Sequence, residues 1–163
     1  MARKSAVLIP VIIAAVAVGA LGIAFVPPDI KDRDTSFPKG TVRIGDDAIT
    51  VEVAETAAEQ QRWMTFRHDQ LPLDTAMLIK YDRPDLYEVW MLNVEYNLDL
   101  IWIDEHGNVV YMKKDVPPCS NVVETVSCTY KTTKQALYVV AATSGFIDEH
   151  HISVGSKMTI ISA

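Results

Sequence analysis

The sequence predicts a mostly β protein: a compact jelly-roll or barrel-like β domain with two short helices, preceded by one N-terminal transmembrane helix. Short runs rich in β-branched and aromatic residues follow one another closely, with turn residues between them. Such spacing favours a sandwich or barrel over a βαβ layout. The densest run covers residues 87–104. An uncharged apolar segment, residues 6–26, precedes the domain and predicts the transmembrane helix.

The composition is that of a folded protein with an acidic domain. Hydrophobic residues make up 49% and charged residues 22% of the 163 positions, which argues against disorder. The formal net charge is −6, and two of the bases, Arg3 and Lys4, precede the apolar segment. Because an acidic domain is repelled by phosphate backbones, nucleic acid is not an expected partner.

The apolar segment 6–26 would be about 31 Å long as a helix, close to the hydrocarbon thickness of a bilayer. Arg3 and Lys4 precede it and Pro27 follows it, so the tip is expected in the cytoplasm and the later residues outside. A cleaved signal peptide is the main alternative, and a buried core helix is another. The predicted division is a membrane anchor at residues 1–28, a linker at 29–40 and an extracytoplasmic β domain at 41–163.

The first elements expected in the domain are a hairpin and a capped helix. Residues 41–45 and 48–53 flank a Gly45-Asp46-Asp47 turn, as in a β-hairpin. Thr56-Ala57-Ala58-Glu59 has the form of a capping box. We therefore expect a short helix from Ala57 to Trp63 or Met64.

The middle of the domain should hold its central strands. A loop is expected over residues 67–72, and a strand over 76–81 that the turn residues 82–85 end. The stretch 87–104 then reads as two core strands joined through Asn93–Asn97, because it is dense in β-branched and aromatic residues.

The remaining elements are a hairpin, an irregular segment, a strand, a helix and a closing strand. The hairpin is the clearest, because apolar runs flank a loop that contains Gly107. These elements are, in order, strands at 100–103 and 109–113 around a turn at 104–108, the irregular segment 115–132, a strand at 136–141, a helix capped by Thr143 or Ser144 and ending at His150, and a turn and strand at 152–161.

Six short motifs, in this order over about residues 41–160, resemble the domain of unknown function 192 family (DUF 192). The order of the set, rather than any one motif, carries the resemblance. The motifs are Trp63-Met64-Thr65-Phe66-Arg67; Leu71-Pro72 followed by Ala76-Met77-Leu78; Trp90-Met91-Leu92-Asn93-Val94; Leu98-Asp99 followed by Ile103-Asp104; Pro117-Pro118-Cys119 with Cys128 and Tyr130; and Ser144-Gly145 with Val154-Gly155.

The resemblance implies a small β-rich domain, often exported, and no established activity. This sequence departs from the family pattern at four positions. Trp63 stands for a glycine, Leu92 for a lysine, Asn97 for a proline and His151 for a glycine. The missing lysine weakens the expectation of a charged site shared with the family.

Cys119 and Cys128 are the two cysteines of the chain. In an exported domain such a pair predicts a disulfide, and free thiols or metal binding are the alternatives. Closing so short a loop is worth roughly 2.5–3 kcal/mol in the chain-entropy model.

Arg67, Asn93 and Asp99 are the candidate site residues, because each lies in a motif beside an apolar strand. In the structural interpretation Asp99 pairs with Arg67 and Asn93 satisfies the backbone of a turn. In the functional interpretation they line a pocket mouth, with Asp99 as acceptor or base and Arg67 binding an anion.

Aromatic, histidine and methionine side chains suggest two further roles. Trp63, Trp90 and Trp102 could offer a stacking surface for a sugar, although we expect at least two of them in the core. Thioethers with imidazoles would suit copper, but core packing is the expected use of the methionines, and no metal is predicted. The residues concerned are His68, His106, His150, His151, Met64, Met77, Met91, Met112 and Met158.

The first functional hypothesis is a membrane-anchored extracytoplasmic binding or accessory domain that is non-catalytic and has no cofactor. Residues 6–26 would hold it to the lipid bilayer, and an envelope ligand or a membrane protein would be its partner. One alternative is a small enzyme that acts on an envelope polymer through Asp99 with Arg67 or Asn93. The other is a protein that handles copper or another metal.

Overall fold

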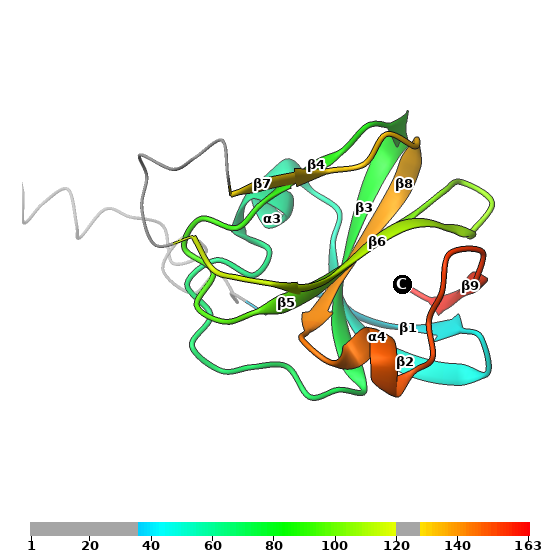
Figure 1. Ribbon diagram of the computed structural model, residues 1–163, viewed down its shortest axis with the longest axis horizontal. Coiled ribbons are helices and arrows are strands. Elements are labelled where there is room, and N and C mark those ends of the chain that lie inside the picture. Colours follow the sequence, from blue (N-terminus) through cyan, green and yellow to red (C-terminus); the bar gives the residue numbers. More distant parts are fainter. Residues whose placement is uncertain (1–35, 120–127) are drawn as a thin grey trace, which may run out of the picture. The chain divides into compact units, whose positions relative to one another are not determined.

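The computed structural model describes residues 36–119 and 128–163. Over these residues the chain is mostly β, as predicted, with nine strands and two short helices (Figure 1). The predicted anchor at 1–28 lies outside the described residues. Within them, no helix has the length and hydropathy needed to cross a membrane.

Seven strands form one mixed sheet in the order β6-β5-β8-β3-β2-β1-β9, and β4 and β7 form a separate two-stranded ribbon. The helices are α3 (Ala57–Arg62) and α4 (Phe146–Glu149). The strands are β1 (Lys39–Ile44), β2 (Asp47–Ala54), β3 (Thr75–Asp85), β4 (Glu88–Trp90), β5 (Leu98–Ile103), β6 (Val109–Val116), β7 (Thr129–Lys131), β8 (Ala136–Thr143) and β9 (Met158–Ser162).

The main sheet is open, which corrects the predicted jelly-roll or barrel-like arrangement. Strands β2 and β3 lie parallel, with Val51 opposite Ala76, and α3 is in their connection. The domain therefore contains a β–α–β unit, which the strand spacing had disfavoured. A parallel pair needs a crossover of a dozen or more residues, and residues 55–74 supply it. The edge strands β6 and β9 approach at one end, where the Met158 amide donates to the Gly107 carbonyl at 2.7 Å.

Hydrophobic cores lie on both faces of this sheet. Successive side chains of a strand point to opposite faces, and all six residues of β5 are buried. Trp102 joins one core with the end of α3 and the β4–β7 ribbon, whereas Ile101 and Ile103 join the other with Phe146 of α4. The sheet is thus the middle layer, with the ribbon and α3 on one side and α4 on the other (Figure 1).

Locally encoded elements form as predicted. β1 and β2 make the expected antiparallel hairpin, and β5 and β6 make the second one. The capping box is complete: the Glu59 amide donates to Thr56 Oγ1 at 3.3 Å, and the Thr56 amide donates to the Glu59 carboxylate at 2.9 Å. These contacts join residues close in sequence, so the pattern alone is sufficient to indicate them.

The stretch 87–104 forms two strands that bury core residues, as predicted, but they do not lie side by side in one sheet. β4 pairs with β7, with Val89 opposite Tyr130, while β5 lies in the main sheet between β6 and β8. The linking residues bury Met91 and Val94 in the core between ribbon and sheet. Burying them there separates the two strands into different layers.

Two further boundaries differ from the prediction. The strand expected to end at the turn residues 82–85 continues to Asp85, and its register against β8 shifts between Lys80 and Asp85. Pro84 has no amide hydrogen to donate, and such an irregularity accommodates it within the strand. The irregular segment expected over 115–132 contains the end of β6 and the short strand β7; residues 120–127 lie outside the described part.

Candidate functional site

Asp99 is buried and serves as a structural anchor. Only 1% of the Asp99 surface is exposed to solvent. One carboxylate oxygen accepts from the Asp115 amide at 2.9 Å, and the other from the amides of Gly145 at 3.1 Å and Ile147 at 2.9 Å. These bonds cap α4 from a different strand. The predicted cap by Thr143 or Ser144 was therefore wrong: Gly145 is the N-cap residue and has no side-chain cap.

Arg67 pairs with Glu52 rather than with Asp99, which corrects the predicted ion pair. Both terminal guanidinium nitrogens, Nη1 and Nη2, contact the Glu52 carboxylate, and the side chains of Arg67 and Glu52 are 24% and 15% exposed. Glu52 lies on β2, opposite Met77 of β3, and Arg67 lies in the connection between α3 and β3. The pair thus secures the segment after α3 to the sheet and leaves Arg67 no free fork for an anion.

Asn93 lies in a tight turn, as predicted, but its side chain bonds to no described backbone group of that turn and instead lines a cleft. Its φ is 58°, and its carbonyl accepts the Phe66 amide at 2.8 Å. Phe66 itself has a φ of 58°, which is uncommon for a bulky side chain. Of the three candidates only Asn93 reaches the cleft, so the described contacts do not bring Arg67, Asn93 and Asp99 into one site.

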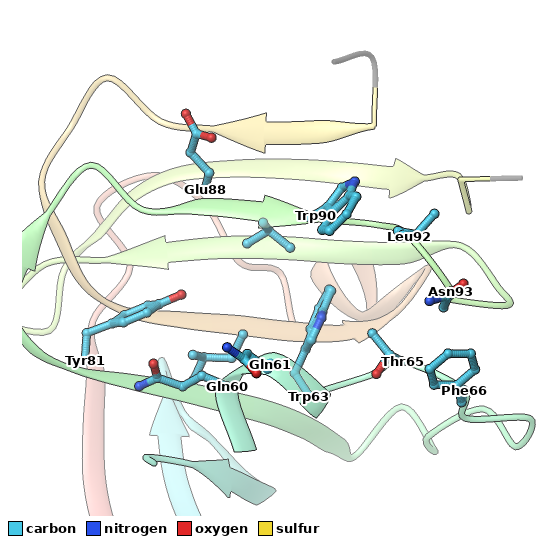
Figure 2. Close-up of a pocket in the computed structure, with 12 residues that line it drawn as sticks. Gln60, Gln61, Trp63, Thr65, Phe66, Tyr81, Glu88, Trp90, Leu92 and Asn93 are labelled. Carbon is cyan, nitrogen blue, oxygen red and sulfur yellow. The ribbon is translucent and has the colours of Figure 1, made fainter. Parts of the chain in front are cut away.

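The cleft lies between α3 and β4 and has a volume of about 430 Å³, within the range of sites that bind small molecules. Figure 2 shows Trp63, at the end of α3, and Trp90, on β4, projecting from opposite sides, with Tyr81 of β3 at one end and Phe66 and Asn93 at the other. The lining residues are Gln60, Gln61, Trp63, Thr65, Phe66, Ile79, Tyr81, Glu88, Val89, Trp90, Leu92 and Asn93.

The cleft combines aromatic surface with rigid support. Trp90 is 46% and Phe66 69% exposed, whereas Trp63 is 6% exposed. Tyr81 stacks on Tyr87 with ring centroids 3.4 Å apart and planes 6° apart. Trp102 is fully buried and its indole N–H donates to the Tyr87 carbonyl at 2.9 Å, so it belongs to the core.

A disulfide holds the ribbon beside the cleft. Cys119 and Cys128 are bonded, as predicted, with Cα atoms 5.6 Å apart. The Met91 amide donates to the Cys128 carbonyl at 3.1 Å, and the Met91 carbonyl accepts the Cys119 amide at 3.2 Å. Met91 lies between Trp90 and Leu92, which line the cleft, so the bridge fixes that wall of it.

The histidines and methionines are dispersed. His68 contacts Glu95 on the surface, and His150 contacts Asp47, whereas Met64, Met77 and Met91 are fully buried in one core. In the part of the chain that the structure describes, no three His, Cys, Asp or Glu side chains gather as in a metal site.

Sequence reasoning missed Gln61, Phe66 and Tyr81 as lining residues. Gln61 lies in the last turn of the capped helix α3 and Phe66 within the motif that begins at Trp63, and these positions are a usable signal. Tyr81 gave no signal, because its place at the cleft depends on how β3 packs against α3 and β4.

Comparisons with known proteins agree with this fold. The family model described as DUF192, Uncharacterized ACR, matches residues 40–160. No curated protein matches the chain.

Two solved structures share the fold. A proposed transcription regulator from Sinorhizobium meliloti 1021 is 20% identical, with a TM-score of 0.69 over 78% of this chain and 97% of that one. A protein of unknown function from Novosphingobium aromaticivorans DSM 12444 is 21% identical, with a TM-score of 0.68 over 77% of this chain and 88% of that one. At such identity the likeness concerns the fold alone.

Proposed function

Since this chain belongs to the DUF192 family, which is described as uncharacterised, we propose from its own geometry that it is a non-catalytic extracytoplasmic binding domain. In this proposal residues 6–26 tether the domain to the membrane, and the cleft between α3 and β4 receives an envelope component. The observation that carries the proposal is the cleft itself. It gathers exposed aromatic faces and polar side chains on a rigid wall.

The position of Asp99 supports a binding role over an enzymatic one. A general acid or base must reach its substrate, and Asp99 is buried with both carboxylate oxygens bonded to backbone amides. Arg67 is likewise paired with Glu52. The enzyme proposed on Asp99, Arg67 and Asn93 therefore finds no support in the contacts of those residues.

Export is supported by the disulfide and by the leading segment. Disulfides persist in oxidising compartments and are rare in the cytosol, and Cys119 and Cys128 are bonded. Residues 6–26 have the length and apolar character of a spanning helix, with Arg3 and Lys4 on the expected cytoplasmic side. The acidic balance of the chain argues against a nucleic acid partner.

The test is retention by envelope material. Full-length protein in phosphatidylcholine nanodiscs is mixed with envelope fragments from cells that lack it, and the fragments are sedimented. We expect the wild type to co-sediment and Trp90→Ala to remain in solution. Leu86→Ala is the control, because Leu86 is 51% exposed and does not line the cleft. Equal sedimentation of all three proteins would refute a role for the cleft.

Location is tested on intact cells with an external protease. We expect the domain to be digested without lysis, because the proposal places residues after Pro28 outside. Protection of the domain until lysis, with both sulfurs reduced, would overturn the extracytoplasmic assignment.

A further inference from the structure

The chemistry of the cleft identifies the class of its ligand, and this inference rests on the binding role proposed above. Among the residues that the structure describes, the lining side chains include no lysine, arginine or histidine, so an anionic ligand would find no counter-charge on them. Glu88, the one carboxylate among the described lining residues, pairs with Lys131 of β7 at 3.6 Å. In Figure 2 the Glu88 carboxylate points away from the cleft. The cleft therefore favours an uncharged ligand.

Its aromatic side chains fit a ligand with flat apolar faces. The face of an aromatic ring carries partial negative charge, which attracts the slightly positive C–H groups on one face of a sugar ring. Trp90, which is 46% exposed, offers such a surface from β4, and the small exposed part of Trp63, which is 6% exposed, lies opposite it at the end of α3 (Figure 2). A small uncharged molecule with C–H faces and an otherwise polar perimeter can lie between them.

Four of the polar groups around these rings have no hydrogen-bond partner among the described residues, whereas the side chains of Gln60 and Thr65 are bonded to backbone carbonyls. The side chains of Gln61 and Asn93, the indole N–H of Trp63 and the hydroxyl of Tyr81 make no hydrogen bond with the described residues. An amide both donates and accepts, as a sugar hydroxyl does. Burial raises the pKa of Tyr81 to about 12, so its hydroxyl keeps its proton and can donate.

The arrangement is fixed before a ligand arrives. Phe66 and Asn93 both have positive φ, and the hydrogen bond from the Phe66 amide to the Asn93 carbonyl joins them at one end of the cleft. Strained backbone of this kind is found at sites where the surrounding structure holds it for function. A preformed site loses less freedom on binding.

We infer that the ligand of the α3–β4 cleft is a neutral carbohydrate, held as a short oligosaccharide between Trp63 and Trp90. The amides of Gln61 and Asn93 contact its hydroxyl or N-acetyl groups. Free donor and acceptor groups beside aromatic faces, with no unpaired charge among the described lining residues, suit a neutral carbohydrate better than a charged one.

The experiment is isothermal titration calorimetry of the full-length protein in phosphatidylcholine nanodiscs. Cellotriose and the trimer of N-acetylglucosamine are the neutral probes. The trimers of glucosamine and of galacturonic acid are matched probes with positive and negative charge. We expect the neutral trimers to saturate at millimolar concentration and the charged ones to bind about tenfold more weakly or not at all.

Titrations of single-residue variants then test whether the trimers bind in the cleft. Trp90→Ala should weaken the affinity for the neutral trimers about tenfold, and Trp90→Phe should recover part of that affinity. Leu86→Ala should leave the affinity unchanged. Unchanged melting temperatures show that the variants fold, as expected for a side chain as exposed as that of Trp90.

Three results would overturn the inference: no saturation by either neutral trimer, tighter binding of a charged trimer, or neutral binding that Trp90→Ala does not alter. The carbohydrate inference can fail while the proposed binding role of the cleft holds. If envelope fragments retain the wild type but not Trp90→Ala, while no neutral trimer binds, the cleft is a binding site for another class of ligand.

Discussion

Asp99 shows how far one side chain can differ from the role that its motif suggests. An aspartate at the start of a strand, next to family-like residues, is a natural catalytic candidate. In the fold the same carboxylate accepts the amides of Asp115, Gly145 and Ile147, and so joins β5 to β6 and to the start of α4. Gly145 has no side chain to cap the helix, and Asp99 takes over that task.

We predict that Asp99→Asn destabilises the protein by about 3 kcal/mol. Hydrogen bonds to a charged group are worth about 1.5–3 kcal/mol each, and the asparagine NH₂ would oppose amides that need an acceptor. Urea denaturation of the full chain measures the change in free energy of unfolding.

The control is Asp148→Asn, whose side chain is 72% exposed and pairs with Lys114 on the surface. We expect it to change the free energy of unfolding by no more than about 0.5 kcal/mol. Asp99→Asn with wild-type stability would mean that the buried network contributes little to the fold.

At the scale of elements, the β4–β7 ribbon depends on the disulfide. Each strand has only three residues, and their register pairs Val89 with Tyr130. A two-stranded ribbon of this length is marginal alone. The bond between Cys119 and Cys128 closes the segment that leads into β7, and both cysteine backbones are bonded to Met91.

Reduction of the disulfide should therefore lower both stability and cleft affinity. The chain-entropy model assigns roughly 2.5–3 kcal/mol of stabilisation to closing this loop. Losing that stabilisation should lower the melting temperature by several degrees. Retention by envelope fragments should fall as well, because the wall that carries Trp90 loosens. Differential scanning calorimetry with and without dithiothreitol measures the first effect.

The matched variant carries both Cys119→Ser and Cys128→Ser. It should melt at the same temperature as the reduced wild type, and dithiothreitol should not change that temperature. A wild type whose melting temperature does not respond to reductant would contradict the assigned stabilisation.

At the scale of the whole molecule, His150 links parts of the chain that are far apart in sequence. Its Nδ1 lies 2.8 Å from the Asp47 carboxylate, and its Nε2 lies 2.6 Å from the Leu73 carbonyl. Its ring also packs on Phe146, with centroids 4.6 Å apart. Because a carbonyl and a carboxylate both accept, the geometry favours the doubly protonated ring.

We predict that this contact makes stability depend on pH. Burial lowers the pKa of His150, but hydrogen bonds to the Leu73 carbonyl and the Asp47 carboxylate outweigh it and raise that pKa above its usual 6.5. The folded protein thus binds the proton more tightly than the unfolded chain. The contribution is fully present below pH 6.5 and is lost as the pH rises through the folded pKa.

Melting temperatures across the neutral range check this, with His150→Gln as the comparison. The difference between wild type and variant should shrink as the pH rises. A difference that stays constant, or grows at alkaline pH, would contradict a raised pKa.

The sequence by itself determined the elements whose contacts are local. The hairpin of β1 and β2, the capping box at Thr56 and Glu59 and the hairpin of β5 and β6 each depend on residues only a few positions apart. Turn residues and alternating apolar side chains specify such contacts directly. The disulfide was predictable for a different reason, since only two cysteines were present.

Only the tertiary structure decided which distant groups meet. It separated β4 from β5, paired Arg67 with Glu52, placed Asp99 under α4 and set Trp63 opposite Trp90 across the cleft. Strand partners and buried acceptors are selected by packing the whole core, so many pairings are compatible with the same local pattern. The cleft exists because α3 and the ribbon cover the same face of the sheet, and no short motif records that arrangement.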